Sequence, residues 1–109
     1  MCELPFTISL HEGFGDSHLD LFLDIDGISR LITFGTVASN WPLLQNGTSI
    51  PFQRKKDHRR DYLDLEGEIE GKGRLRILFR GSAKAYSIPE NVSGWTELTA
   101  SIKDGTLTL

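Results

Sequence analysis

The chain has 109 residues, of which 39% are hydrophobic and 25% are charged. This length suits one domain, and this balance excludes a disordered polypeptide, because enough apolar side chains are present to form a core. The net charge of −3 and the pI near 5.5 exclude a protein coated in positive charge, but they allow a local basic patch.

The single cysteine and the lengths of the apolar runs indicate the cellular compartment in which the protein is expected. Cys2 is the single cysteine, so the chain has no disulfide framework of its own and a reducing compartment is expected. No apolar run approaches the length of a membrane span, and the first residues do not show a basic segment followed by an apolar run. We therefore expect a cytoplasmic protein.

The first third of the chain predicts three strands. Residues 6–11 alternate between apolar and polar side chains, and residues 12–17 form a loop with two glycines. Residues 18–25 alternate again, with leucines and an isoleucine on one face. Asp26-Gly27 then predicts a two-residue type I′ hairpin turn, which leads into a third strand at about 28–34.

Residues 35–51 contain glycine, proline, asparagine and serine without any period, which predicts a long loop. We expect Trp41 and Leu43-Leu44 to attach the middle of this loop to the core. No segment of the chain shows a sustained helical period.

The rest of the chain alternates in short segments. The further strands predicted in this part are 62–69, 74–79, 83–88, 95–102 and 106–109. A turn is expected at residues 71–73, a break at Gly81, and a hairpin turn at Asp104-Gly105. Short strands separated by turn signals predict an all-β barrel or sandwich.

His18 and Asp20 form the centre of a candidate metal site. They lie on one face of the predicted strand, with Cα atoms about 7 Å apart, so both side chains can reach one ion. If the first two strands are neighbours, His11 lies near the same hairpin end. Two imidazoles and a carboxylate suit Mn²⁺, Zn²⁺ or Fe²⁺. The alternative is that each histidine is only solvated or hydrogen-bonded, because this spacing often occurs by chance.

A cluster of basic residues forms a candidate phosphate site. Its members are Arg54, Lys55, Lys56, Arg59 and Arg60. Basic runs are usually solvated loops, but His58 inside the run and Tyr62 beside it favour phosphate chemistry. Cations can hold the anion while a proton carrier protonates the leaving oxygen. Glu66 is either a solvated strand residue or a buried group that supports the site.

Two blocks of sequence, DHRRDYLDLEG at residues 57–67 and HLDLFLD at residues 18–24, resemble the signatures of one known family. The first is similar to D-H-x-x-x-Y-x-D-F/Y-E-G, and the second to H-Y/W-D-L/F-x-L-E/D. Both signatures belong to the 3′-phosphoesterase domain of bacterial DNA repair ligase D, in the DNA polymerase ligase N-terminal domain family. The resemblance runs from about Phe6 to Gly81, and residues 105–109 are similar to the last strand of the short stand-alone members.

This resemblance implies a small single-domain antiparallel β-barrel, spanning residues 1–109, that binds Mn²⁺, with Zn²⁺ or another divalent ion as an alternative. It implies hydrolysis at the 3′ end of DNA or of an RNA–DNA primer during DNA repair. The implied metal ligands are His11, His18 and Asp20. The implied catalytic residues are His58 and Tyr62, which contact the phosphate. Asp24 stands where the family has an acidic residue that supports the site.

Phe22 stands where the ligase-linked domains carry an arginine that can clamp phosphate. Other cations would then have to hold the phosphate, among them Arg74 and Arg76, which share a face of the predicted strand 74–79. A second interpretation therefore stays open. It is a catalytically weak or inactive β-barrel module that binds nucleic acid or a partner such as a DNA repair ligase or polymerase.

Overall fold

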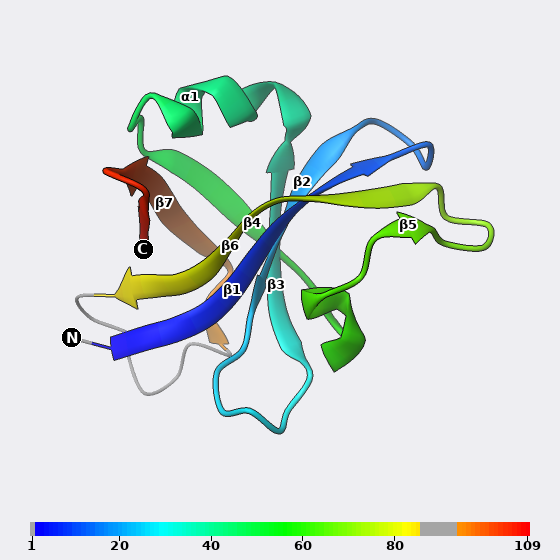
Figure 1. The fold of residues 1–109 in the computed structure, drawn as a ribbon, viewed down its shortest axis with the longest axis horizontal. Helices are drawn as coiled ribbons and strands as arrows, with labels where there is room; N and C mark the ends of the chain where they lie inside the picture. The colour runs from blue at the N-terminus through cyan, green and yellow to red at the C-terminus, as the bar shows by residue number, and fades with distance from the viewer. Residues whose placement is uncertain (1, 86–93) are drawn as a thin grey trace.

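The computed structural model describes residues 2–85 and 94–109, most of which are in β-strands (Figure 1). In this part of the chain eight strands form one mixed sheet. They are β1 (Cys2–Glu12), β2 (His18–Leu23), β3 (Leu31–Val37), β4 (Ile50–His58), β5 (Gly67–Glu68), β6 (Arg74–Ala85), β7 (Glu97–Lys103) and β8 (Thr106–Thr108). Their order is β1-β2-β3-β4-β7-β8-β6-β5, and β1 also pairs with β6, so the sheet closes on itself through seven strands.

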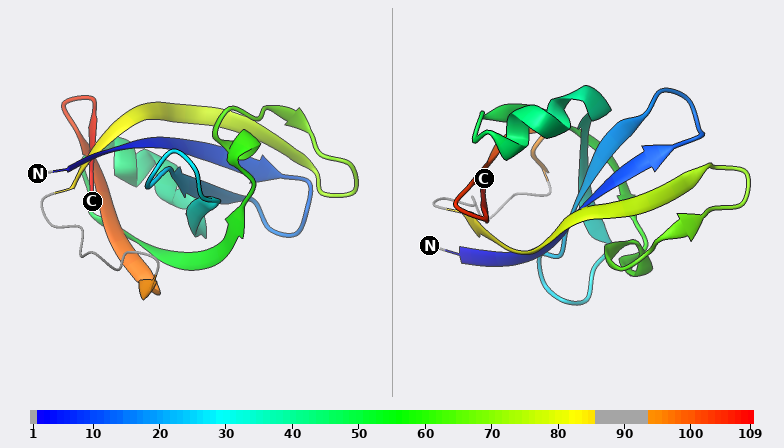
Figure 2. Two further views of the ribbon diagram at one scale, coloured as in Figure 1. Left: turned by 90° about the horizontal axis from the view of Figure 1, so that it is seen from below. Right: turned by 45° about the horizontal axis from the view of Figure 1, so that its top comes forward.

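Alternation along the strands produces the core that lies inside this closed sheet. Leu19, Leu21 and Leu23 of β2 are fully buried and belong to one apolar cluster with Phe6 and Ile8 of β1. Figure 2 shows the sheet curling round, with β4 and β6 on opposite sides. The predicted apolar face of residues 18–25 is therefore the inner face of the sheet, and the alternate residues lie on its outer face.

Residues 38–45 are helical, and the prediction of a structureless loop at 35–51 is wrong there. A 3₁₀ turn, η1 (Ala38–Asn40), leads into α1 (Trp41–Gln45), which lies across one end of the sheet (Figure 1). Such a short helix cannot show a helical period, and Pro42 in its first turn resembled a loop signal. Leu44 is buried and Trp41 packs on the core, as expected, whereas Leu43 is 43% exposed.

No helix in the described part of the chain is long and apolar enough to cross a membrane.

One of the two predicted hairpin turns is confirmed. Asp104 and Gly105 both have positive φ, 51° and 72°, as a type I′ turn between β7 and β8 requires. The two-residue turn at Asp26-Gly27 is wrong, because β2 ends at Leu23 and β3 begins at Leu31. The Asp26 carboxylate accepts the Ile28 and Ser29 N–H groups and the Ser29 hydroxyl, so it stabilises a wider loop. These bonds lower the pKa of Asp26 to about 2.

The predicted strand at 62–69 is also wrong, apart from the two residues of β5. A 3₁₀ turn, η2 (Arg60–Leu63), precedes β5 and packs on β2 and β3. The Thr7 hydroxyl, buried on the outer face of β1, donates to the Leu63 carbonyl oxygen at 2.5 Å. The start of this segment therefore packs on the outer face of the sheet instead of pairing as a strand.

Three further predictions are corrected by the pairing of β4, β6 and β8. The basic run at 54–60 is largely the strand β4 rather than a loop. β6 continues through Gly81, where a break was expected, while residues 86–88 of the predicted strand lie outside the described residues. β6 and β8 run parallel at Lys84 and Thr108, so the expected antiparallel arrangement does not hold throughout.

The turn at residues 71–73 is confirmed, and it presses against the start of the β1–β2 loop. Gly71 and Gly73 have φ of 71° and 76°. A Cβ atom on Gly73 would overlap the Glu12 carbonyl oxygen and lie 2.8 Å from the Gly13 carbonyl carbon, whereas nothing lies within 4 Å of the corresponding position on Gly71. Gly73 is therefore required both by its backbone conformation and by the backbone of residues 12–13.

We expect Gly73→Ala to lower the free energy of unfolding more than the matched variant Gly71→Ala. The Gly71 variant should show only the strain of a left-handed alanine, about 1–3 kcal/mol. The Gly73 variant adds a backbone overlap to the same strain. Urea unfolding of both proteins tests this, and equal destabilisation would contradict the close contact between the two loops.

Candidate metal centre

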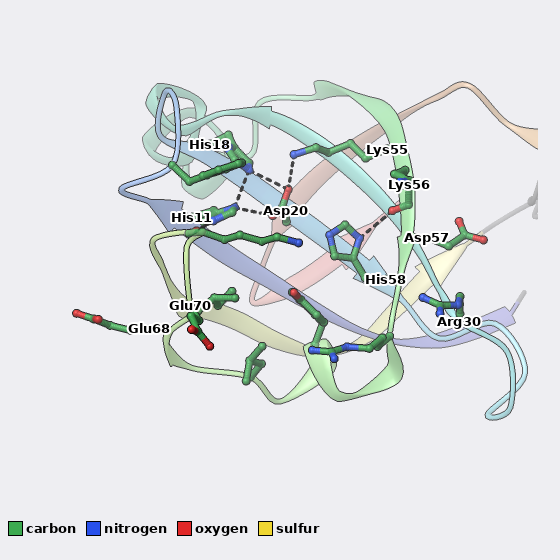
Figure 3. Close-up of a pocket in the computed structure, with 16 residues that line it drawn as sticks. His11, His18, Asp20, Arg30, Lys55, Lys56, Asp57, His58, Glu68 and Glu70 are labelled. Atoms are coloured by element: carbon green, nitrogen blue, oxygen red, sulfur yellow. Dashed lines mark hydrogen bonds and ion pairs between the residues drawn. The ribbon is translucent and has the colours of Figure 1, made fainter.

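The outer faces of β1 and β2 bring together two histidines and an aspartate. His11 and His18 are register partners, and Asp20 is two residues further along β2. His11 Nδ1 lies 3.1 Å from His18 Nε2, and the Asp20 carboxylate lies 3.7 Å from the first nitrogen and 3.4 Å from the second (Figure 3). The histidines are half-buried and Asp20 is 2% exposed.

Two backbone carbonyls determine which ring nitrogens carry hydrogen. His11 Nε2 donates to the Lys72 carbonyl oxygen at 2.5 Å, and His18 Nδ1 donates to the Asp16 carbonyl oxygen at 3.0 Å. A carbonyl can only accept, so the lone pairs of the neutral rings lie on His11 Nδ1 and His18 Nε2. These are the two nitrogens that face each other at 3.1 Å. A cation bound by both nitrogens would satisfy these two lone pairs.

The set of donors fits a metal ion. The three ligand atoms lie within 4.8 Å of one another, and the group could hold a metal ion. Two nitrogens bound to one ion at about 2.1 Å, roughly at a right angle, would be about 3 Å apart. Outer hydrogen bonds to carbonyl oxygens are typical of metal-binding histidines, since they orient the ring.

Ser9 provides an independent sign that the site takes a further group. It is the register partner of Asp20, and its hydroxyl is fully buried. This hydroxyl has no hydrogen-bond partner among the described residues. Buried hydroxyls are rarely left unpaired, so the orphaned oxygen beside Asp20 is consistent with a site that is completed by a ligand.

Lys55 also belongs to this centre. Its Nζ lies 2.9 Å from Asp20 Oδ1, so it compensates the buried carboxylate. The side chain reaches Asp20 across Gly35, which is the register partner of Asp20 on β3. A Cβ atom on Gly35 would lie 2.6 Å from Lys55 Cδ, so the glycine leaves the path open. Lys55 was predicted only as a nucleic-acid contact, and the structure places it on a candidate metal ligand.

His58 faces the cluster from β4. The pairing of β3 with β4 shifts between Leu31 and Thr33, so that His58 follows Lys55 onto the outer face. His58 Nδ1 donates to the Lys56 carbonyl oxygen at 2.8 Å and lies 3.1 Å from Thr33 Oγ1. Its Nε2 therefore carries the lone pair. Figure 3 shows the ring between Asp20 and the main chain of β4.

The fully buried Phe22 helps to position His58. The centroid of the Phe22 ring lies 5.3 Å from that of the His58 ring and 5.7 Å from that of the Tyr62 ring. The centroids of the His58 and Tyr62 rings are 4.8 Å apart. Burial lowers the pKa of His58 below its ordinary value of 6.5, so the neutral imidazole prevails at pH 7. A buried apolar ring thus stands where the resemblance leads one to look for a phosphate-binding arginine.

A pocket of about 970 Å³ connects these groups. It is lined by the three candidate ligands, by His58 and Tyr62, and by several charged side chains. The cations on its wall are Arg30, Lys55, Lys56, Arg59 and Lys72. Figure 3 shows Glu68 and Glu70 at one end and Arg30 and Asp57 at the other, with Asp20 and His58 between them.

The other predicted phosphate-binding cations do not line this pocket. Arg54 lies over the Phe34 ring at 5.7 Å and bonds Asp57 at 2.7 Å. Arg74 lies 3.6 Å from a Glu12 carboxylate oxygen, and Arg76 is exposed.

Arg60 and Asp24 form a bidentate pair at the other end of β2. The guanidinium bonds the two carboxylate oxygens at 2.9 and 2.6 Å and also donates to the Ser29 carbonyl. The bond from Arg60 lowers the pKa of Asp24, and the same pair raises the pKa of Arg60. This pair fastens η2 to the loop after β2, and neither residue lines the pocket.

Glu66 binds the main chain of β6 rather than a group in the pocket. Its carboxylate accepts the Ile77 N–H at 3.0 Å, where the pairing of β1 with β6 shifts register. It therefore supports the shape of β6 beside the site.

No family model matches the chain, and comparisons with curated proteins and with solved structures find no match either.

The sequence did not indicate several groups that complete the centre. The Lys72 and Asp16 carbonyls are main-chain atoms and have no sequence signature. Thr33 and Arg30 become candidates for the site only once the pairing of β3 with β4 is known. Phe14 had a signal, because it is an aromatic residue between two glycines in the loop that joins two candidate ligands.

We expect Asp20→Ala to weaken binding of Mn²⁺ or Zn²⁺ and Lys55→Met to strengthen it. Asp20 supplies a negatively charged ligand. The Lys55 ammonium forms an ion pair with the same carboxylate and repels a metal ion that would bind there. Removing that repulsion in a partly exposed site should tighten binding by about tenfold. Calorimetric titration measures both affinities, with Asp26→Ala as the control carboxylate outside the pocket. Unchanged affinity in Asp20→Ala would contradict the assignment.

The His58 imidazole should titrate below 6.5 in an NMR titration of the wild type, since burial disfavours its charged form. Tyr62→Ala should move the value back toward 6.5 by opening the site. As the pH falls below 6.5, His58 in the unfolded chain binds a proton before His58 in the folded protein does. This difference lowers the free energy of unfolding below pH 6.5 and has no effect on it well above that pH. A wild-type value at or above 6.5 would be inconsistent with this environment.

Proposed function

We propose that this chain is a metal-dependent phosphoesterase that acts on nucleic acid 3′ ends, with the barrel-type fold of the 3′-phosphoesterases and a cytoplasmic role in DNA repair. The observation that carries the proposal is the convergence of His11, His18 and Asp20 with His58 in one pocket. The same pocket is lined by cations as well as by carboxylates, and these cations would bind an anionic substrate.

The candidate ligands would hold Mn²⁺, or Zn²⁺ as the alternative, which when bound would polarise the phosphoryl oxygens and lower the pKa of a water. His58 offers the Nε2 lone pair of a neutral imidazole, so it can accept a proton or a hydrogen bond at this atom. A phosphate dianion beside the ring would favour protonation of Nε2 from solvent, and the protonated His58 would then donate this proton to the oxygen that leaves the phosphorus.

The remaining polar groups hold the substrate. The Tyr62 hydroxyl would donate a hydrogen bond to a phosphate oxygen, and the packing of its ring against His58 within the pocket supports this role. Lys56 and Arg59 line the pocket and offset negative charge on the nucleic acid backbone. Lys55 can serve in the same way when an ion takes its place at Asp20.

A second function is favoured by one specific observation. Phe22 is fully buried against His58 and Tyr62, and Arg60 is held by Asp24, so neither position supplies a guanidinium to the pocket. A site with fewer charge-stabilising donors suits a module that binds a nucleic acid end, or recruits a repair ligase or polymerase, with little or no turnover.

We expect the purified protein with Mn²⁺ to release phosphate from a 3′-phosphorylated DNA primer, or to remove a single 3′-terminal ribonucleotide. His58→Ala should abolish detectable release while metal affinity stays at the wild-type level. Tyr62→Phe should reduce the rate by about 10²–10³, as is typical for the loss of one preorganised donor.

Lys103→Ala is the matched control, because Lys103 is an exposed cation of β7 outside the pocket. Release that survives His58→Ala would contradict the role of His58. Wild-type protein that binds the primer and the metal but releases nothing would favour the binding module.

A further inference from the structure

We propose that Phe14 is a stacking platform for the base of the terminal nucleotide whose phosphate ester lies in the pocket beside the metal centre. The inference deepens the proposed function and rests on it. It names the ligand class of the site, which is a nucleotide with an intact base, and it names Phe14 as the residue that selects this ligand.

Phe14 is an exposed aromatic ring in a polar setting. Its side chain is 52% exposed and lines the same pocket as the candidate ligands. Ile28, Val37 and Leu43 are also exposed, but in the described part of the chain Phe14 is the one such large apolar side chain that lines the pocket. The core does not account for this position.

The Phe14 ring lies next to a candidate ligand. It is nearly parallel to the His11 ring, with 12° between the planes and 6.1 Å between the centroids. His11 Nδ1 points at His18 and Asp20. One face of Phe14 is stacked on His11, and the ring is 52% exposed, so its opposite face can take a planar group whose phosphate reaches the metal centre.

The loop around Phe14 is held in place by backbone packing. Gly13 and Gly15 flank Phe14 with φ of 81° and 69°, a conformation that other residues rarely adopt. A Cβ atom on Gly13 would lie 3.3 Å from the Gly73 Cα atom, and Glu12 pairs with Arg74. The His11 ring is itself bonded to the Lys72 carbonyl. The ring is thus presented by a braced loop.

A nucleobase fits this surface better than an aliphatic or peptide group. The pocket offers cations for a phosphate and a flat π-face close to them, and every base has a π-face regardless of its identity. Base stacking on an aromatic side chain contributes a factor of about 5 to about 150 in affinity. The platform therefore predicts preference for a base over no base, with little preference among the bases.

The experiment compares two 3′-phosphorylated primers with Mn²⁺, one ending in an ordinary nucleotide and one in an abasic nucleotide. The wild type should show kcat/KM about 5- to 150-fold higher for the ordinary end. Phe14→Ala and Phe14→Leu should lose this preference, and Phe14→Trp should keep it. Ile28→Ala, which removes an exposed side chain outside the pocket, is the control and should keep the preference.

A wild type without preference, or a preference that survives in Phe14→Ala, would overturn the platform. If neither primer is hydrolysed, the hydrolytic function fails and equilibrium binding decides the inference. NMR titrations of the Mg²⁺-equilibrated protein with adenosine 3′-monophosphate and with ribose 3-phosphate then provide the readout. Tighter binding of the nucleotide that is lost in Phe14→Ala supports the platform, and equal binding or none overturns it.

Discussion

Burial of both faces of β2 is the constraint from which the site follows. The closed sheet takes the leucine face into its core, and η2 with the segment after it covers much of the outer face. Asp20 is therefore almost fully buried, and a buried carboxylate must be compensated. Lys55 and the two imidazoles surround it for this reason. A group of donors that could hold a cation therefore follows from packing a carboxylate on a strand whose two faces are largely covered.

Local patterns in the sequence predicted strands well where one face of the strand packs on the core. They predicted a turn correctly only where no side chain binds the backbone of the turn. Asp104-Gly105 makes the expected turn because its strands are paired up to it. Asp26-Gly27 does not, since carboxylates bind the loop's own N–H groups and widen it. Residues 62–69 alternate because one side of the segment covers the sheet, and alternation does not distinguish that arrangement from a paired strand.

The candidate metal ligands could be predicted because same-face spacing is a local property. Placing His11 with them required only that β1 and β2 be neighbours, which the register confirms. The division of the basic cluster could not be foreseen. Lys55 turns to Asp20, Arg60 to Asp24 and Arg54 to Asp57, and these partners are set by tertiary pairing and by a register shift in β4. Charge in a run of sequence therefore overstates the charge available to a ligand.

Closure of the sheet also affects how the protein meets other chains. In the described part, each strand except β5 has neighbours on both sides, and β5 has only two residues. Unpaired strand edges are the usual templates for strand addition and for edge-to-edge aggregation. Closure is not continuous along the strands, because residues 76–83 of β6 pair with β1 on one side and with no described strand on the other. Strand addition from another chain is therefore confined to such partial edges, and recognition elsewhere must use side chains and pockets.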